Sequence, residues 1–317
     1  MPAPDDPDWE RALINRMALE FLRERRRSHR WGMFFRLSIL LYLVILAIAF
    51  ATSGIGESLR GQTEHTALIE VRGPIAPRAE ASADRLITAL RKAFEADKAK
   101  GIVLRINSPG GSPVQSGYVF DEIRRLKEKH PDKPIYAVAA DVCASGAYYI
   151  AVATDEIYVD RATLIGSIGV RLDSFGFDRA MEDLGIQRRL LTAGEHKGIL
   201  DPFSPLVETD KEFLQARLDQ LHTQFIDAVR QGRGERLRGG DELFSGLFWT
   251  GAESVELGLS DHLGSSAEVA REVIGAENIV VYTERRDLLE RLGERVGSAL
   301  ADSLGTLLGL GGMPALR

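Results

Sequence analysis

Hydrophobic and polar positions between residues 66 and 282 follow two different periods. Short apolar, β-prone runs predict strands at Thr66–Val71, Gly101–Asn107, Pro134–Ala140, Glu156–Val159 and Ile279–Tyr282. Apolar residues three or four positions apart predict helices over 81–98, 113–129 and 208–230, and a further short helix is expected after Ser145. Strands that alternate with helices are typical of βαβ units, so the pattern predicts an α/β fold with a mostly parallel sheet.

The last of these helices carries an apolar stripe whose partner the pattern does not identify. Its members are Phe213, Leu218, Leu221, Phe225 and Val229, spaced three to five positions apart and interrupted on the same face by Arg217. Such a stripe packs either on the core of its own domain or on another subunit.

An uncharged segment precedes the globular region. Leu37–Thr52 contains no charged residue, and with the flanking residues from Trp31 it reaches the roughly 20 residues that cross a membrane. Six arginines and one glutamate lie between Arg23 and Arg36. The positive-inside rule therefore predicts an uncleaved, single-pass signal anchor in the inner (plasma) membrane, with a cytoplasmic N-terminus and an extracytoplasmic (periplasmic) globular region.

A cleaved signal peptide is the alternative interpretation, because small-x-small sites lie close to Ala51. More than thirty residues precede the apolar segment, which is long for a signal peptide. The predicted organisation is a basic cytoplasmic segment (1–36), a transmembrane anchor (37–52), a polar linker (53–64), a globular domain (65–285) and an amphipathic, then glycine-rich tail (286–317). The tail fits an interfacial helix, an oligomer contact or a frayed end equally well.

Composition excludes several classes of function. The chain has 317 residues, of which 44% are hydrophobic, and a net charge of −6. Acidic and basic residues are mixed along most of its length, which gives no support to nucleic-acid binding, since that would need a basic face. The single cysteine, Cys143, excludes an internal disulfide framework and a multi-cysteine zinc site. We expect no metal and no cofactor.

A candidate nucleophile lies in the stretch DVCASGAYYIA. Ser145 stands where the strand 134–140 gives way to a helix, and Cys143, two positions earlier, is a rival thiol nucleophile. A lone cysteine between small apolar residues is more typical of buried packing. A hydroxyl at this turn still needs a base to take its proton before it can attack a carbonyl.

Free backbone amides are expected beside Ser145. The strand 101–107 ends in SPGG, and the paired glycines Gly110 and Gly111 let the backbone turn sharply with its amides exposed. The amide of Gly146 lies at a helix N-terminus, where negative charge is favoured. If these amides converge they form an oxyanion hole, although a structural turn alone also explains SPGG.

Two neighbouring residues compete for the role of base. His196 and Lys197 adjoin in the sequence GEHKG, and in extended chain only one of them could face Ser145. A lysine base must be neutral, which requires apolar surroundings and a hydroxyl rather than a carboxylate as its partner. Ser167, in the apolar run TLIGSIGV, could supply that hydroxyl. The residue types alone leave both candidates open.

The ordered set INSPGG, DVCASGAYYIA, IGSIGV, GEHKGILDPF and FWTGAESVELGLSDHLG resembles the signal peptide peptidase A family of membrane-anchored serine–lysine peptidases. The resemblance covers roughly residues 66–282 and matches the short form with one catalytic unit. INSPGG is also similar to a motif in the proteolytic subunit of Clp protease, which has a crotonase-like fold and a Ser-His-Asp triad. The resemblance therefore implies a crotonase/Clp-like fold.

The resemblance also implies roles for individual residues. Ser145 matches the nucleophile, Lys197 the general base and Ser167 the hydroxyl that orients the lysine. The oxyanion amides match Gly146 together with Gly110 or Gly111. His196 departs from the tyrosine often found before the lysine and is a candidate helper, and Gly198-Ile199 replace residues that are often small and hydroxylated.

The implied function is cleavage of hydrophobic peptides such as signal-peptide remnants by a ring- or bowl-shaped homo-oligomer at the bilayer. Ser145 and Lys197 of one site then come from one chain or from two. An acyl-CoA hydratase or thioesterase on the same fold is a rival, but the extracytoplasmic placement argues against a coenzyme A ligand. A non-catalytic membrane scaffold is a second rival, and the complete set of Ser145, Ser167 and Lys197 argues against it.

Overall fold

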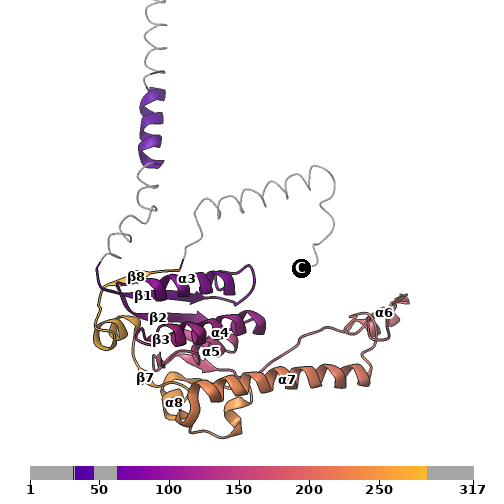
Figure 1. The fold of residues 1–317 in the computed structure, drawn as a ribbon. Coiled ribbons are helices and arrows are strands. Elements are labelled where there is room, and N and C mark those ends of the chain that lie inside the picture. The colour runs from indigo at the N-terminus through magenta and orange to yellow at the C-terminus, as the bar shows by residue number, and fades with distance from the viewer. Residues whose placement is uncertain (1–30, 32, 46–62, 284–317) are drawn as a thin grey trace, which may run out of the picture. The chain divides into compact units, whose positions relative to one another are not determined.

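The computed structural model describes residues 31, 33–45 and 63–283 (Figure 1). These residues belong to two units that divide after Leu59. Residues 33–45 are helical with exposed apolar side chains. None of the helices in the described ranges is both long and apolar enough to cross a bilayer. Most of the predicted basic segment, the end of the predicted anchor, most of the linker and the tail lie outside the described residues.

The second unit is built on an eight-stranded sheet. Its strands are β1 (His65–Arg72), β2 (Ala99–Ser108), β3 (Ile135–Ala144), β4 (Glu156–Val159), β5 (Leu164–Gly166), β6 (Phe248–Thr250), β7 (His262–Leu263) and β8 (Ile279–Val281). The order is β6-β5-β3-β2-β1-β8, while β4 pairs with β3 and β7. Only the β5–β6 pair is antiparallel, so the predicted α/β fold with a mostly parallel sheet is confirmed.

Helices cover the sheet and extend from it (Figure 1). The α-helices of this unit are α3 (Ala83–Glu95), α4 (Pro113–Lys129), α5 (Gly146–Ala151), α6 (Asp178–Asp183), α7 (Glu208–Arg233), α8 (Gly251–Glu256) and α9 (Ser266–Glu268). Two 3₁₀ turns at Gly234–Arg236 and Asp241–Phe244 and a π-helical turn at Val269–Val273 complete the described elements. The helices predicted over 81–98, 113–129 and 208–230 are therefore confirmed as α3, α4 and α7.

The main core lies between the sheet and the helices α3, α4 and α5. Alternation along β1 sends Ala67 and Ile69 to this side, where they join Leu86 and Phe94 of α3. Leu68, the residue between them, points to the other face and joins a smaller cluster there. Both faces of the central strands are thus buried, which explains why the sequences of these strands are continuous apolar runs.

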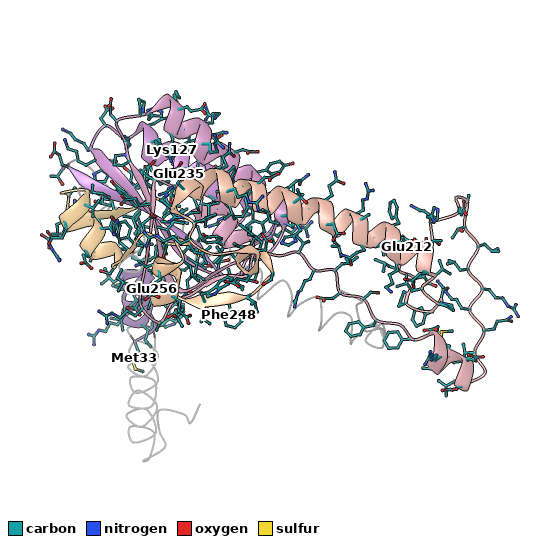
Figure 2. The ribbon with its side chains drawn as sticks, turned by 90° about the horizontal axis from the view of Figure 1, so that it is seen from below. Met33, Lys127, Glu212, Glu235, Phe248 and Glu256 are labelled. Carbon is teal, nitrogen blue, oxygen red and sulfur yellow. The ribbon has the colours of Figure 1, made fainter. Side chains whose placement is uncertain are left out.

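Helix α7 is packed at one end only. Its buried residues are Phe225, Ala228, Val229 and Arg233, all in the C-terminal half. The Arg233 guanidinium fastens this end by donating to both carboxylate oxygens of Asp261 and to the Gly258 carbonyl. Figure 2 shows Glu212 on the part of α7 that projects from the sheet, whereas Glu235 lies within the body of the unit.

Residues 172–220 form an arm. They comprise α6, the irregular chain on either side of it and the projecting half of α7, and α6 lies near the outer end of α7 (Figure 1). The arm exposes apolar side chains, among them Phe175, Leu184 and Leu191 at 76%, 73% and 96%. Phe213, in the predicted stripe of α7, is 55% exposed. The outer half of that stripe therefore does not pack on the core of its own chain.

A buried carboxylate joins α3 to α4. Glu122 of α4 accepts hydrogen bonds from Arg125 in the same helix and from Arg91 of α3. The bonds from Arg125, together with those from Arg91, hold the pKa of Glu122 down to about 2 against the opposing effect of burial. The ionised carboxylate thus stabilises the contact between the two helices.

We expect this group to contribute to acid sensitivity. Because the folded pKa lies below the ordinary 4.5, the contribution is fully present only well above pH 4.5 and is lost as the pH falls toward 2, by roughly 1–2 kcal/mol because solvent screens the half-exposed arginines. Urea unfolding at a series of pH values gives the slope of the unfolding free energy against pH. Between pH 4.5 and 2 this slope should be steeper in the wild type than in Glu122→Gln. Glu128→Gln, at an exposed position of the same helix, is the control. Equal slopes in wild type and Glu122→Gln would contradict the assignment.

Candidate active site

Ser145 occupies the tight turn between β3 and α5. Its backbone has φ 54° and ψ −126°, a conformation that glycine adopts easily and other residues only at a cost of about 1–3 kcal/mol. The turn is held by two hydrogen bonds, because Ser145 N donates to the Gly166 carbonyl at 2.9 Å and Tyr149 N donates to the Ser145 carbonyl at 3.0 Å. The side chain is half-buried, so the sequence correctly placed it at an accessible strand-to-helix turn.

The neighbours of Ser145 belong to the core. Tyr148 is fully buried and its hydroxyl donates to the Leu259 carbonyl at 2.7 Å. Cys143 is also fully buried, and burial raises the pKa of its thiol well above the ordinary value. A thiol in this position is inert at neutral pH. The interpretation of Cys143 as a packing residue is confirmed.

The glycine turn after β2 lies directly against Ser145. A Cβ on Gly110 would lie 2.7 Å from Gly146 N and 2.8 Å from Ser145 Cβ. The Gly110 amide donates to Ser108 Oγ at 3.1 Å. Within the described part of the chain, by contrast, the Gly111 amide donates no hydrogen bond, and this residue is exposed. Gly111 has φ 152° and its Cα faces Ile75, where a side chain would collide with the Ile75 backbone.

A second amide comes from the first residue of α5. Gly146 follows Ser145 and has no partner within the helix for its N–H, as is general for the first turn. A Cβ on Gly146 would lie 3.4 Å from Gly111 N. The predicted meeting of the two glycine segments is therefore found, with Gly111 and Gly146 as the residues whose amides are unengaged.

Ser167 reaches the same place from the neighbouring strand. Ala144 and Gly166 are paired across β3 and β5, so Ser145 and Ser167 follow paired residues. Ser167 also has a positive φ, 50°, and its amide donates to the Leu247 carbonyl at 2.7 Å. The structure therefore places Ser167 beside the Ser145 turn, and its role in orienting the lysine stays a prediction.

These residues line a cavity of about 880 Å³. The four backbone-turn residues named above, Gly110, Gly111, Ser145 and Gly146, lie together with Ser167 in its wall. Its apolar lining comes from Tyr149, Val170, Leu221 and Phe225. The cavity therefore combines a hydroxyl, unengaged amides and an apolar wall.

Lys197 and His196 do not line this cavity within one chain. Both are exposed in the arm, where the Lys197 amide donates to the Gly194 carbonyl at 3.1 Å. The His196 ring contacts Asp210 Oδ1 through Nδ1 at 2.8 Å and stacks on Phe213. Asp210 and Phe213 belong to the projecting half of α7. A single chain thus brings together every predicted site residue except these two.

His222 is a cavity residue that the sequence analysis does not single out. It lies on α7, is half-buried, and its Nε2 donates to the Ile168 carbonyl at 3.1 Å. No acidic residue adjoins it in the sequence to mark it as a base. Its place in the cavity depends on the packing of α7 beside Ile168, which follows β5, and a local sequence pattern does not predict that packing.

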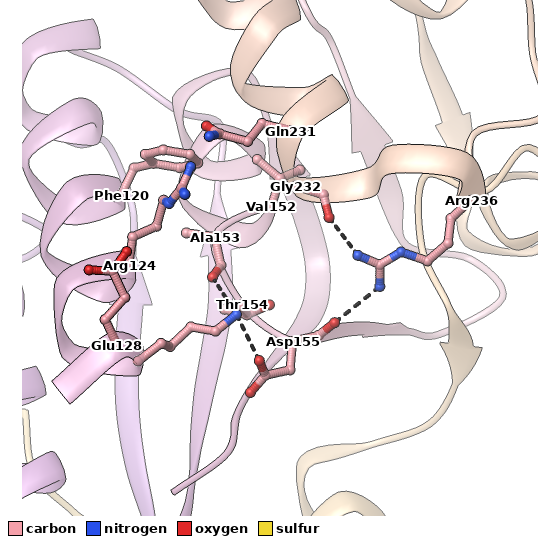
Figure 3. A pocket seen from close by; sticks show the side chains of 11 residues that line it. Phe120, Arg124, Glu128, Val152, Ala153, Thr154, Asp155, Gln231, Gly232 and Arg236 are labelled. Atoms are coloured by element: carbon pink, nitrogen blue, oxygen red, sulfur yellow. Dashed lines mark hydrogen bonds and ion pairs between the residues drawn. The ribbon is translucent and has the colours of Figure 1, made fainter. Parts of the chain in front are cut away.

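A second, smaller cavity of about 400 Å³ lies at the C-terminal end of α5 (Figure 3). Lys127 Nζ contacts Asp155 at 2.7 Å and the Ala153 carbonyl at 3.2 Å. Arg236 donates to the carbonyls of Gly232 and Asp155 (Figure 3). Lys127 is thus paired with a carboxylate and a carbonyl, and Arg236 with two carbonyls. Charged groups paired in this way are typical of a structural contact between elements rather than of a catalytic site.

A serine held in a strained strand-to-helix turn, beside unengaged amides on a parallel α/β sheet, is the arrangement expected of a serine hydrolase. The sequence matches Peptidase family S49 over residues 127–279. It is 30% identical to a putative protease, slr0021, of Synechocystis over 248 residues, which cover 75% of this chain and 87% of that one. The chain belongs to peptidase family S49, as the resemblance had implied.

Other relatives match over a smaller share of their length. The chain is 31% identical to a putative signal peptide peptidase SppA of Enterococcus faecium over 182 residues, or 57% of this chain and 52% of that one. It is 42% identical to a Brucella melitensis protein named Na(+)/H(+) antiporter NhaA over 203 residues, or 64% of this chain. The chain spans only 27% of that Brucella protein.

The strain at Ser145 predicts a stability difference between two variants. Ser145→Gly removes the cost of the positive φ, so it should be more stable than Ser145→Ala by about 1 kcal/mol in urea unfolding. At Ser245, where φ is −84°, Ser245→Gly should instead be less stable than Ser245→Ala, because glycine there only increases the conformational freedom of the unfolded chain. The same order at both positions would contradict the strain at Ser145.

Proposed function

We propose that this protein is a serine endopeptidase that uses Ser145 as nucleophile on a crotonase/Clp-like fold. One observation carries the proposal: Ser145 is held at a strained turn with the unengaged amides of Gly111 and Gly146 beside it. Amides fixed in this way stabilise an oxyanion without having to reorganise during the reaction. Membership of peptidase family S49 supports a peptide bond as the bond that is cleaved.

In the proposed mechanism, Ser145 Oγ attacks the carbonyl carbon of the scissile peptide while Lys197 Nζ takes the hydroxyl proton. The negative charge that develops on the carbonyl oxygen is stabilised by the amides of Gly111 and Gly146. The Gly110 amide already donates to Ser108 Oγ, which supports Gly111 over Gly110 for this role. Lys197 then protonates the leaving amine, and water activated by the same lysine hydrolyses the acyl-enzyme.

Lys197 is proposed to come from a second copy of the chain. The cavity lining of one chain includes Ser145 and Ser167 but not Lys197. The arm that carries Lys197 exposes large apolar side chains, and the outer half of α7 has no buried residue. Apolar surface of this kind is typical of subunit interfaces. A homo-oligomer, ring- or bowl-shaped as in the family, would let each arm cover the cavity of its neighbour and place Lys197 beside Ser167.

The proposed substrates are hydrophobic peptides such as signal-peptide remnants. The cavity wall of Tyr149, Val170, Leu221 and Phe225 supports apolar side chains next to the cleaved bond. The proposed location is the extracytoplasmic side of the inner membrane, with residues 37–52 as anchor. A thioesterase would use the same amides, so purified protein should also be tested with an acyl thioester, for which we expect no turnover.

Mixed oligomers test whether each site is shared between chains. Ser145→Ala and Lys197→Ala should each abolish peptide cleavage, because each removes a group that the mechanism requires. Co-expression of the two variants with different tags, followed by double-tag purification, should restore about a quarter of wild-type activity, since about one site in four then has both groups. Purified oligomers of each variant alone are the controls. Mixed oligomers that stay inactive would place the base in the same chain as Ser145.

The two histidines provide a second test of the base. His196→Ala should keep most of the activity, because that ring contacts Asp210 and Phe213 in the arm. His222→Ala should lower kcat/KM moderately, because the ring forms part of the cavity wall, but it should retain measurable cleavage. The measurement is kcat/KM on an apolar peptide, with folding checked by circular dichroism. Complete inactivity of His222→Ala, together with an active Lys197→Ala, would assign the base to His222 instead.

A further inference from the structure

Ser116 carries a buried hydroxyl without a partner. The residue belongs to the first turns of α4, is fully buried, and its Oγ has no hydrogen-bond partner among the described residues. Its backbone N–H donates to the Ser112 carbonyl at 3.1 Å. A serine inside a helix commonly turns its hydroxyl to that same carbonyl, but Ser116 does not. Buried hydroxyls are normally bonded, so this one requires a physical explanation.

The hydroxyl lies against Gly146, one of the two residues that offer a candidate oxyanion amide. Ser116 lines the same cavity as Ser145 and Gly146. A side chain on Gly146 would collide with Ser116 Oγ, and its Cβ would lie 3.4 Å from Gly111 N. Ser116 Oγ and the Gly111 amide therefore surround the same face of Gly146. The absence of a side chain at Gly146 lets the α4 hydroxyl approach the N-terminus of α5.

A hydroxyl without a hydrogen-bond partner beside the candidate oxyanion amides is suited to donate to an acceptor that is present only during the reaction. The hydroxyl hydrogen of serine can rotate toward whichever acceptor is present. A carbonyl oxygen that becomes negatively charged is a far better acceptor than a neutral group in water-free surroundings. The donor would therefore be most effective in the transition state, which is the condition for raising kcat.

We propose that Ser116 Oγ is a further hydrogen-bond donor of the oxyanion hole, acting beside the amides of Gly111 and Gly146. This inference rests on the proposed peptidase function and adds a side-chain donor to it. The hydroxyl donates to the oxygen of the tetrahedral intermediate and releases it when the carbonyl reforms. No proton is transferred from Ser116 in this step.

Ser116→Ala should lower kcat on an apolar peptide by about 10- to 100-fold with little change in KM, since a donor that acts in the transition state is lost. Its Tm should stay the same or rise, because the hydroxyl has no partner in the free protein. Ser116→Cys has a similar shape and a weaker donor, so its kcat should lie between those of the wild type and Ser116→Ala.

Ser254→Ala is the matched control. Ser254 is another fully buried helical serine, but its hydroxyl is bonded to Ser260 Oγ and to the Gly251 carbonyl. Its loss should lower Tm and leave kcat unchanged. A peptide aldehyde, which forms a hemiacetal oxyanion with Ser145, gives a second readout: Ser116→Ala should weaken its inhibition by the same factor as kcat/KM.

The outcomes separate this inference from the proposed function. Wild-type kcat in a folded Ser116→Ala variant, with the wild type active, would overturn the role of Ser116 and leave the peptidase intact. A lower Tm with unchanged aldehyde inhibition would show a structural hydroxyl and also overturn it. Wild-type protein that cleaves no peptide and does not bind the aldehyde would overturn the proposed function, and this inference with it.

Discussion

The pairing of β3 with two of its parallel neighbours, β2 and β5, is the constraint on which the site depends. Ala144 is paired with Gly166 of β5, and Cys143 is paired with Ser108 of β2. Because the strands are parallel, their carboxyl ends meet at one edge of the sheet, and the residues that follow them converge there. A slip of one residue in either pairing would turn the side chains to the other face and separate the hydroxyls from the glycine amides.

Much of this edge could be predicted from sequence, because it is built from local signals. The long buried strands, the helices α3 and α4, and the turns at Ser145 and Gly110 all have clear patterns. The strands β5, β6 and β7 have two or three residues each, too few for a period to be detected. The positions of Ser116 and His222 could not be predicted, because their roles depend on which helix packs against the turn and not on their neighbours in sequence.

Helix α7 shows a different limit of sequence interpretation. Its apolar stripe extends from Phe213 to Val229, yet only the inner half is buried, where Phe225 and Val229 pack on the core and Arg233 binds Asp261. The outer half, with Phe213, remains exposed and belongs to the same arm as Lys197. A periodic pattern reports that a surface needs a partner but not whether the partner is the same chain. The proposed sharing of the site between chains follows from this division, and the membrane anchor remains a prediction.

The central claim is that the turn at Ser145 makes its hydroxyl the reactive nucleophile of the chain. The most direct measurement is labelling of the folded, full-length protein with a fluorophosphonate, followed by tandem mass spectrometry of the digested product. We predict one dominant adduct, located on Ser145, that heat-denatured protein does not form. An unlabelled Ser145 in folded, peptide-cleaving protein, or an adduct of equal yield on another serine, would contradict it.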